Sequence, residues 1–249
     1  NHSPLVVAEQ FGTMATIYPD RLDLGLGRAP GTDMPTADAL RRSQHDAVHT
    51  FPEDVKALLR YLGPEHRQGV VKAYPGVGTE VPIYILGSSP DSAVLAAQLG
   101  LPYVFASHFA PKYMEAAISI YRKHFRPSQY LKSPYMMICL NVIAAETDEE
   151  ANFEFTSMQQ FFAGVVRSSQ TFLPPPVENM DDLWSPQEKE IVSSMTSVTF
   201  LGSKDSIREQ LTRFQEKYHA DEIMVVTYIY DHAKQIRSYE LFKQIVDGN

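Results

Sequence analysis

The chain has 249 residues, of which 44% are hydrophobic and 21% charged, and its 22 basic and 30 acidic residues give a formal net charge of −8. This composition is typical of a globular protein and excludes a disordered or fibrous chain. The acidic balance argues against a nucleic-acid surface, so we expect a small-molecule partner. No apolar run approaches the roughly 20 residues of a membrane-spanning helix and no secretory leader opens the sequence, so we expect no membrane insertion and a cytoplasmic location.

The sequence opens on a predicted helix. Ser3 places a hydroxyl cap before Pro4 at the first helical position, and the helix is expected to reach about residue 18. Ser89 and Ser185 each precede a proline in the same way. Short runs rich in β-branched and aromatic residues then predict five buried strands. These strands span residues 21–27, 81–87, 101–107, 134–145 and 222–230.

Segments with helical spacing lie between and after these strands. Strand and helix therefore alternate, which predicts an α/β protein with parallel strands, right-handed crossovers and a sheet covered on both faces. About 250 residues is the usual size of a complete (β/α)8 barrel, but the strand count is too low for one. The predicted helices cover residues 90–99, 111–124, 147–166, 203–218 and 231–246.

Two stretches, residues 32–62 and 168–199, are longer than a crossover requires. The second carries three consecutive prolines and the tryptophan of the chain. Loops of this length usually act as lids or are disordered. Because we find neither an internal repeat nor a linker, residues 1–249 are predicted to form a single domain with a lid or insertion at about 168–199.

A glycine-rich turn follows the first predicted strand. Residues 25–31 read Gly-Leu-Gly-Arg-Ala-Pro-Gly, and they lack the glycine spacing and the acidic partner of a dinucleotide-binding Rossmann turn. Arg28 lies just beyond the carboxyl end of the strand, where α/β folds collect ligands, and arginine prefers phosphate or carboxylate there. The alternative is a surface arginine in a glycine-rich turn.

A hydroxyl-rich turn follows the second predicted strand and opens the next helix. Gly87 allows close backbone approach, Ser88 and Ser89 offer hydroxyls and amides, and Ser92 lies one turn into the helix. Asp91 opposes anion binding unless it faces away. The alternative is an ordinary helix start.

The two turns follow successive strands, and the carboxyl ends of parallel strands lie at one edge of a sheet. Arg28 and the helix N-terminus at residues 89–92 are therefore expected to hold one phosphate, with neither a lysine nor a metal required. The sequence lacks a Walker lysine motif, which argues against nucleoside triphosphate chemistry.

Other patterns give weaker indications. His45 and His49 have the spacing of a helical zinc site, but no third ligand is evident, and we expect no metal. Cys139, the single cysteine, lies in an apolar strand and is expected to be inert. Residues 105–109 end the third strand, so they could line a pocket for a planar ring beside the phosphate. The alternative places Phe105 in the core and His108 in a loop.

The order of these motifs resembles the bacterial luciferase-like monooxygenase family, most closely its single-chain branch. The resemblance rests on Ala-Glu-Gln-Phe at residues 8–11, on residues 21–31 and 87–90, and on the alanine-rich helix at 93–100. It implies an α/β fold of the TIM (β/α)8 type with a lid insertion, and reduced FMN held at the carboxyl ends of the strands.

The resemblance also implies site residues and chemistry. The arginine and hydroxyl residues that bind the flavin phosphate in the family correspond to Arg28, Ser88, Ser89 and Ser92, beside Gly87. Reduced FMN, supplied by a flavin reductase, would react with oxygen and oxygenate an aldehyde or other small organic substrate. The alternatives are a deazaflavin-dependent reductase on the same barrel and a non-catalytic flavin-binding protein. The family also implies a homodimer.

The sequence departs from the family at its start. The family begins with three strands and a glutamate-histidine-histidine segment that have no counterpart here, so we expect the chain to be the C-terminal part of a barrel of about 330 residues. No catalytic residue is carried over, and His2 and His108 are candidates by position only. Five strands alone would leave two long edges exposed, so we predict that the native protein has the missing strands.

Overall fold

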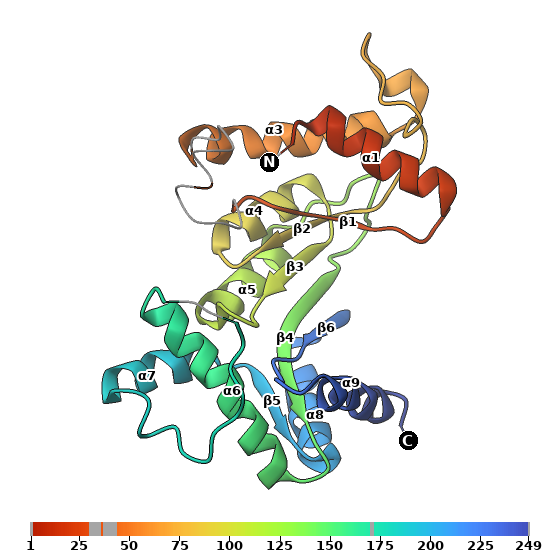
Figure 1. Cartoon of the computed structure of the whole chain (residues 1–249). Coiled ribbons are helices and arrows are strands. Elements are labelled where there is room, and N and C mark those ends of the chain that lie inside the picture. The colour runs from red at the N-terminus through yellow and green to blue at the C-terminus, as the bar shows by residue number, and fades with distance from the viewer. Residues whose placement is uncertain (1, 30–35, 37–43, 170–171, 249) are drawn as a thin grey trace. The chain divides into compact units, whose positions relative to one another are not determined.

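The computed structural model shows an α/β protein in which every strand of the described chain is followed by a helix (Figure 1). It describes residues 2–29, 36, 44–169 and 172–248. The alternation of strand and helix agrees with the sequence pattern. No helix in this described part is both long enough and apolar enough to cross a membrane.

The first of two compact units comprises Asn1–Val104 and Ile120–Pro134. The opening helix, the first two strands and the helix after the second strand lie where the sequence predicts them, with ends that differ by at most three residues, whereas the helix Gln44–Leu62 was not predicted. Its elements are α1 (Pro4–Ile17), β1 (Leu24–Gly27), α3 (Gln44–Leu62), β2 (Ile83–Gly87) and α4 (Pro90–Leu99), with a 3-10 turn at Glu65–Arg67.

Strands β1 and β2 pair in parallel, with Leu24 opposite Ile83 and Gly27 opposite Leu86. Their carboxyl ends therefore lie at the same edge. The side chains alternate along the strands, because Leu24 and Ile83 are buried whereas Leu86 is exposed. The amide of Ile85 donates to the carbonyl of Pro102 at 2.9 Å, just before the next strand, β3 (Tyr103–Ala106).

The second compact unit comprises Phe105–Ser119 and Tyr135–Asn249. Strand β3 and helix α5 (Met114–His124) each have residues in both units. The remaining elements are β4 (Met136–Ala144), α6 (Asp148–Val166), α7 (Pro186–Met195), β5 (Thr199–Gly202), α8 (Lys204–Tyr218), β6 (Glu222–Val226) and α9 (His232–Val246). Whether the whole chain is a single domain stays a prediction.

Strand β4 is the centre of the second unit, and all nine of its residues are buried. It pairs in parallel with β5, from Asn141 opposite Thr199, and with β6, from Met137 opposite Glu222. A strand that is buried throughout is covered on both faces, as the continuous apolar run predicts. Strand β5 was not predicted, because its four residues are too few to show a period.

The outer strands have one neighbour each in the described chain. Strand β1 pairs with β2, and β5 and β6 each pair with β4. Met224 in β6 is 51% exposed, although it lies in the middle of an apolar strand. The further strands that the family resemblance implies stay a prediction.

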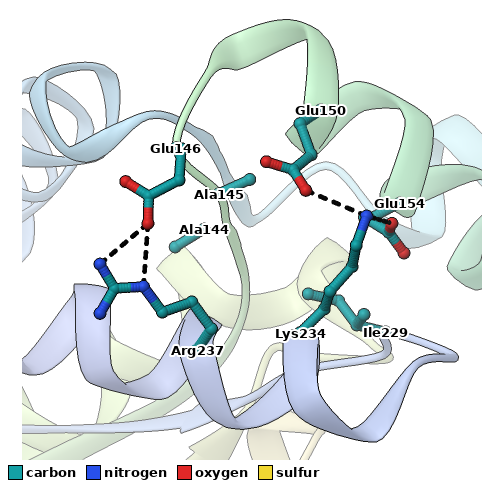
Figure 2. Close-up of a pocket in the computed structure, with 8 residues that line it drawn as sticks. All are labelled: Ala144, Ala145, Glu146, Glu150, Glu154, Ile229, Lys234 and Arg237. Atoms are coloured by element: carbon teal, nitrogen blue, oxygen red, sulfur yellow. Dashed lines mark hydrogen bonds and ion pairs between the residues drawn. The ribbon is translucent and has the colours of Figure 1, made fainter.

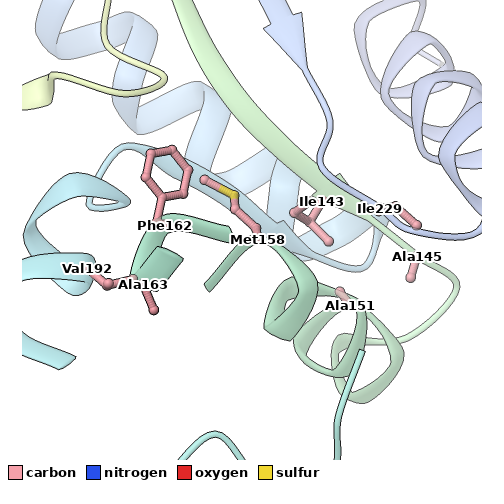
Figure 3. Close-up of a cluster of buried hydrophobic side chains, with 8 residues drawn as sticks. All are labelled: Ile143, Ala145, Ala151, Met158, Phe162, Ala163, Val192 and Ile229. Carbon is pink, nitrogen blue, oxygen red and sulfur yellow. The ribbon is translucent and has the colours of Figure 1, made fainter. Parts of the chain in front are cut away.

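The apolar core of the second unit forms where α6 covers the carboxyl end of β4 (Figure 3). Ala151, Met158 and Phe162 recur at helical spacing on one face of α6 and belong to the same buried cluster as Ile143 of β4. Val192 brings α7 onto the same cluster. The ring of Phe162 also lies 5.9 Å from that of Tyr228, beyond β6.

The serine-proline helix starts behave differently from one another. The Ser185 hydroxyl accepts a hydrogen bond from the Glu188 amide, and the Glu188 carboxylate accepts one from the Ser185 amide, so both halves of a capping box are present. Ser3 and Ser89 occupy the N-cap position, but within the described chain their hydroxyls make no capping bond. The predicted hydroxyl caps are therefore wrong at these two helices, where proline already removes one amide donor.

The segment predicted as a lid lies against α6 at several points. The Gln160 amide donates to the Pro175 carbonyl at 2.9 Å, and the Val177 amide donates to the Thr156 hydroxyl at 2.8 Å. Arg167, at the end of α6, donates to both carboxylate oxygens of Glu188 at 2.6 and 3.1 Å. These contacts fasten α7 and the proline-rich segment to one helix. Movement as a lid stays a prediction.

The Arg167–Glu188 pair predicts how the attachment of α7 depends on pH. The hydrogen bond from Arg167, helped by those from Ser185, lowers the pKa of Glu188 from 4.5 to about 2. Because the folded pKa is the lower one, the stabilisation is complete above pH 4.5 and is lost as the pH falls toward 2. We expect Glu188→Gln to lower the free energy of unfolding at pH 7 and to reduce its fall between pH 5 and pH 3, as measured by urea unfolding.

Glu190→Gln, at an exposed position of α7, is the charge-matched control. It should leave the fall in stability between the two pH values close to that of the unmodified protein. If Glu188→Gln loses as much stability on acidification as the unmodified protein, the pair does not account for the acid sensitivity.

Candidate functional site

The turns after β1 and β2 meet in the first unit. The register places Gly27 opposite Leu86, so Arg28 and the Gly87 turn follow at the same edge. The Arg28 guanidinium Nη2 lies 3.5 Å from Asp91 Oδ2, in the first turn of α4. The structure therefore brings together the two motifs that the sequence paired. Pro30 and Gly31, the last residues of the first motif, lie outside the described residues.

The edge formed by these turns is accessible to solvent. The side chain of Arg28 is 38% exposed and that of Asp91 is 75% exposed, while Ser88 and Ser89 are half-buried. Because Ser89 forms no side-chain cap in the described chain, the first-turn amides of α4 point beyond the helix without a capping hydroxyl. An accessible guanidinium and the positive end of a helix dipole thus lie together, which is an arrangement that favours an anion.

The Ser92 hydroxyl, which the sequence suggested as a phosphate ligand, is hydrogen-bonded within the turn. It donates to the Ser89 carbonyl at 2.7 Å and lies 2.9 Å from the Tyr103 hydroxyl. Tyr103 also donates to the Ser89 carbonyl, at 3.2 Å, and burial raises its pKa to about 12. Ser92 therefore holds the turn from inside. Sequence reasoning missed Tyr103, because its partners belong to another strand-helix unit of the chain.

Gly87 is required by the contact between the strand end and the helix. A Cβ atom at this position would lie 1.9 Å from the Ser92 Oγ and 2.3 Å from its Cβ, and 3.5 Å from the Tyr103 hydroxyl. At Gly27, the corresponding end of β1, a Cβ would have its nearest contact at 3.8 Å, with Leu86. The glycine after β2 thus permits the close approach that holds Ser92 and Tyr103 together.

His2 and His108 lie in different compact units. His2 is exposed, just before α1. The His108 ring packs edge-on against Phe109 with centroids 4.6 Å apart, and its Nδ1 is buried with no hydrogen-bond partner in the described part of the chain. Burial lowers the pKa of His108, so the ring is predominantly neutral at pH 7. Phe105 is fully buried, as the core alternative predicts.

Strand β4 holds the turn that contains His108. The buried amide of Asn141 donates to the His108 carbonyl at 2.6 Å, and the Ser107 hydroxyl donates to the Cys139 carbonyl at 2.6 Å. Asn141 Oδ1 is left without a partner among the residues described. Sequence reasoning missed Asn141, although a single amide inside a nine-residue apolar strand is a usable signal.

The remaining sequence candidates show no reactive geometry. Cys139 is buried, and burial raises its thiol pKa to about 11, which keeps it protonated. His45 and His49 lie in α3, but the positions of their side chains are outside the described residues. Elsewhere in the described chain, no group of three or more histidine, cysteine or acidic side chains is placed to hold a metal ion.

A small charged pocket opens between the starts of α6 and α9 (Figure 2). Lys234 donates to Glu154 at 2.6 Å and forms an ion pair with Glu150 at 3.0 Å. Arg237 pairs with Glu146 at 2.8 Å. The pocket has a volume of about 50 Å³, which holds a few water molecules and is far below the roughly 300–1,000 Å³ of an organic ligand site.

The buried carboxylate of Glu154, in the lining of this pocket, helps to hold α6 and α9 together. The residue is 2% exposed, and its Oε2 has no partner in the described chain, so Lys234 is the charge that compensates it. The hydrogen bond with Glu154 also raises the pKa of Lys234. A buried carboxylate held by one lysine stabilises the junction of α6 and α9, and its loss would leave an uncompensated charge.

Replacing Gly87 tests the close packing at the turn. We expect Gly87→Ala to lower the free energy of unfolding by about 1–3 kcal/mol, because the added methyl group overlaps Ser92. Gly27→Ala, where the space is open, is the matched control and should be closer to neutral. Urea unfolding measures both, and equal losses would contradict the packing argument.

Replacing Lys234 tests the buried carboxylate. We expect Lys234→Met to cost about 1–3 kcal/mol of unfolding free energy, because the buried Glu154 carboxylate loses its hydrogen-bond donor and its compensating cation. The control is Lys243→Met on the same helix, whose exposed pair with Asp247 at 2.5 Å should contribute less than about 1 kcal/mol. Similar effects of the two changes in urea unfolding would show that Glu154 does not depend on Lys234.

Comparison with known proteins places the chain in a family. Residues 1–220 match the luciferase-like monooxygenase family. The chain is 51% identical over 247 residues to the uncharacterized protein YddN of Bacillus subtilis, with 99% of this chain and 73% of that protein covered. It is 48% identical over 241 residues to a luciferase-like monooxygenase of Escherichia coli strain K12, with 97% and 72% covered.

Solved structures show the same fold. Apo-MsnO8 matches with a TM-score of 0.87 and 32% identity, covering 99% of this chain and 74% of that one. Two more distant structures share the fold alone, each covering 99% of this chain and 75% of its own. They are the oxygenating constituent of 3,6-diketocamphane monooxygenase from Pseudomonas putida in complex with FMN (TM-score 0.65, 16% identity) and an F420-dependent secondary alcohol dehydrogenase (TM-score 0.69, 15% identity).

These matches confirm the parallel α/β fold class of the luciferase-like TIM-barrel enzymes, which the family resemblance implied. The number of further strands in the native protein stays a prediction. Because residues 1–220 match the family and the motifs and the fold agree with it, the chain belongs to the luciferase-like monooxygenase family.

Proposed function

We propose that the protein is a flavin-dependent monooxygenase that uses reduced FMN and oxygen to oxygenate a small organic substrate, such as an aldehyde. The observation that carries the proposal is the meeting of Arg28 with the start of α4 at one sheet edge. Membership of the luciferase-like monooxygenase family supports oxidoreductase chemistry, and an FMN complex of a protein with the same fold supports the cofactor.

The residues at this edge fit a flavin phosphate. The Arg28 guanidinium is accessible and could form charge-assisted hydrogen bonds with phosphate oxygens. The amides at the start of α4 and the hydroxyls of Ser88 and Ser89 would complete the site, beside the close-packed Gly87. Ser92 would act from inside by holding the turn through the Ser89 carbonyl.

When bound, reduced FMN supplies the oxidation chemistry, and the chain would bind and orient it and exclude water. His108 is a candidate for handling a proton. Its ring is predominantly neutral at pH 7, and its Nδ1 is buried without a partner in the described chain, so this nitrogen could hold or accept a proton. His2 is the second positional candidate. Neither residue is assigned to a step.

The proposal extends to partners and location. Reduced FMN would come from a separate flavin reductase, the substrate and oxygen would be the other small-molecule partners, and the protein would act as a homodimer in the cytoplasm. These statements rest on the family resemblance. Light scattering of the purified protein would measure the mass of the assembly directly.

Two alternatives remain as proposals of different kinds. An F420-dependent enzyme shares this fold, which favours a deazaflavin-dependent reductase as the second candidate. A non-catalytic flavin-binding protein is the third. The cofactor that binds and the consumption of oxygen separate all three.

Replacing Arg28 tests the phosphate site. We expect Arg28→Ala to weaken FMN binding about 10- to 100-fold, the equivalent of losing roughly 1.5–3 kcal/mol of charged hydrogen bonding. Arg21→Ala, at an exposed position before β1, is the control and should bind FMN as the unmodified protein does. Equal affinities of Arg28→Ala and the unmodified protein, measured by fluorescence titration, would exclude Arg28 from the site.

Oxygen consumption tests the reaction class. The full chain, supplied with FMN, a flavin reductase and NAD(P)H as its electron donor, should consume oxygen faster in the presence of a small aldehyde than the reductase does alone. Binding of FMN without such an increase would favour the non-catalytic alternative, and tight binding of a deazaflavin in place of FMN would favour the reductase.

A further inference from the structure

We infer that Asp91 acts as an internal competitor for the phosphate, occupying Arg28 when the site is empty and weakening phosphate binding through its charge. The inference rests on the proposed function, because it concerns the affinity of the same site. It assigns to Asp91 a role opposite to that of the neighbouring serines, which offer donors to an anion.

The geometry of the ion pair supports displacement. The 3.5 Å between Arg28 Nη2 and Asp91 Oδ2 exceeds the roughly 2.7–2.9 Å of a strong charge-assisted hydrogen bond. Both side chains are exposed, Asp91 at 75%, so solvent screens the attraction. Such a pair contributes little to folding, and a phosphate with better geometry could replace it.

Asp91 also competes for the second attractive feature of the site. It lies in the first turn of α4, where a carboxylate is stabilised by the positive end of the helix dipole. A phosphate bound between Arg28 and the start of α4 would draw on the same two positive features. The carboxylate would then have to leave Arg28 while remaining close to the phosphate, and the like charges would repel.

Because Asp91 is exposed, moving its side chain away from Arg28 costs little free energy. Among the residues that the structure describes, Arg28 is the only cation that lies within 4 Å of the Asp91 carboxylate. The hydrogen bonds described among Ser89, Ser92 and Tyr103, which are partly buried, do not involve the Asp91 side chain. Rotation of Asp91 into solvent would therefore free Arg28 without disturbing the turn. The repulsion that remains should depend on salt, as expected for exposed charges.

The experiment compares Asp91→Asn with Asp23→Asn in FMN titrations at low and high salt. Asp23 is an exposed carboxylate just before β1, at the opposite end of the strand from Arg28, so its replacement changes the net charge equally. We expect Asp91→Asn to bind FMN about 3- to 10-fold more tightly at low salt, with the gain nearly absent at 1 M salt. Asp23→Asn should stay within about twofold of the unmodified protein.

Titration with riboflavin, which lacks the phosphate, tests whether the effect of Asp91 depends on the charge of the phosphate. The affinity for riboflavin should be the same in Asp91→Asn and in the unmodified protein. Unchanged or weaker FMN binding by Asp91→Asn, or an equal gain for riboflavin and FMN, would overturn the role of Asp91 while leaving the flavin site intact. Failure of the unmodified protein to bind FMN at all would overturn the proposed function, and the inference with it.

Discussion

The parallel pairing of β1 with β2 is the constraint on which the candidate site depends. Arg28 and Asp91 are far apart in sequence, and only a register that ends both strands at one edge can place them 3.5 Å apart. Helix α4 begins just after β2 ends, so its first turn lies at this same edge. The positive end of that helix and the arginine are thus consequences of one topology, and an anion site at the strand ends follows from it.

Close packing then decides which groups at this edge face outward. Gly87 lets Ser92 approach the end of β2, and Tyr103 ties Ser92 to the Ser89 carbonyl from within. The Ser92 hydroxyl, which the sequence suggested as a phosphate ligand, is hydrogen-bonded within the turn, and its part in binding phosphate stays a prediction. Arg28 remains exposed at this edge and Ser88 and Ser89 are half-buried, while the Ser89 carbonyl accepts the internal hydrogen bonds of the turn.

Elements with strong periodicity could be predicted from the sequence, and contacts between distant elements could not. Helix α4 ends at the predicted residues and β4 lies within its predicted run, because proline, glycine and a continuous apolar stretch mark them locally. Strand β5 is too short to show a period. The partners of Tyr103 and Asn141 depend on folding, and a serine before a proline does not reveal whether its hydroxyl will cap the helix.

Two charged sites, one in each compact unit, show why one is a candidate for binding and the other is structural. In the second unit, Lys234 is held at 2.6 Å by a carboxylate that is 2% exposed, and separating them would leave Glu154 charged in the interior. In the first unit, Arg28 faces a carboxylate that is 75% exposed at 3.5 Å, and separating them returns both groups to water. A ligand phosphate can therefore exchange with Asp91 at small cost, whereas no ligand could exchange with Glu154 without disrupting the contact of α6 with α9.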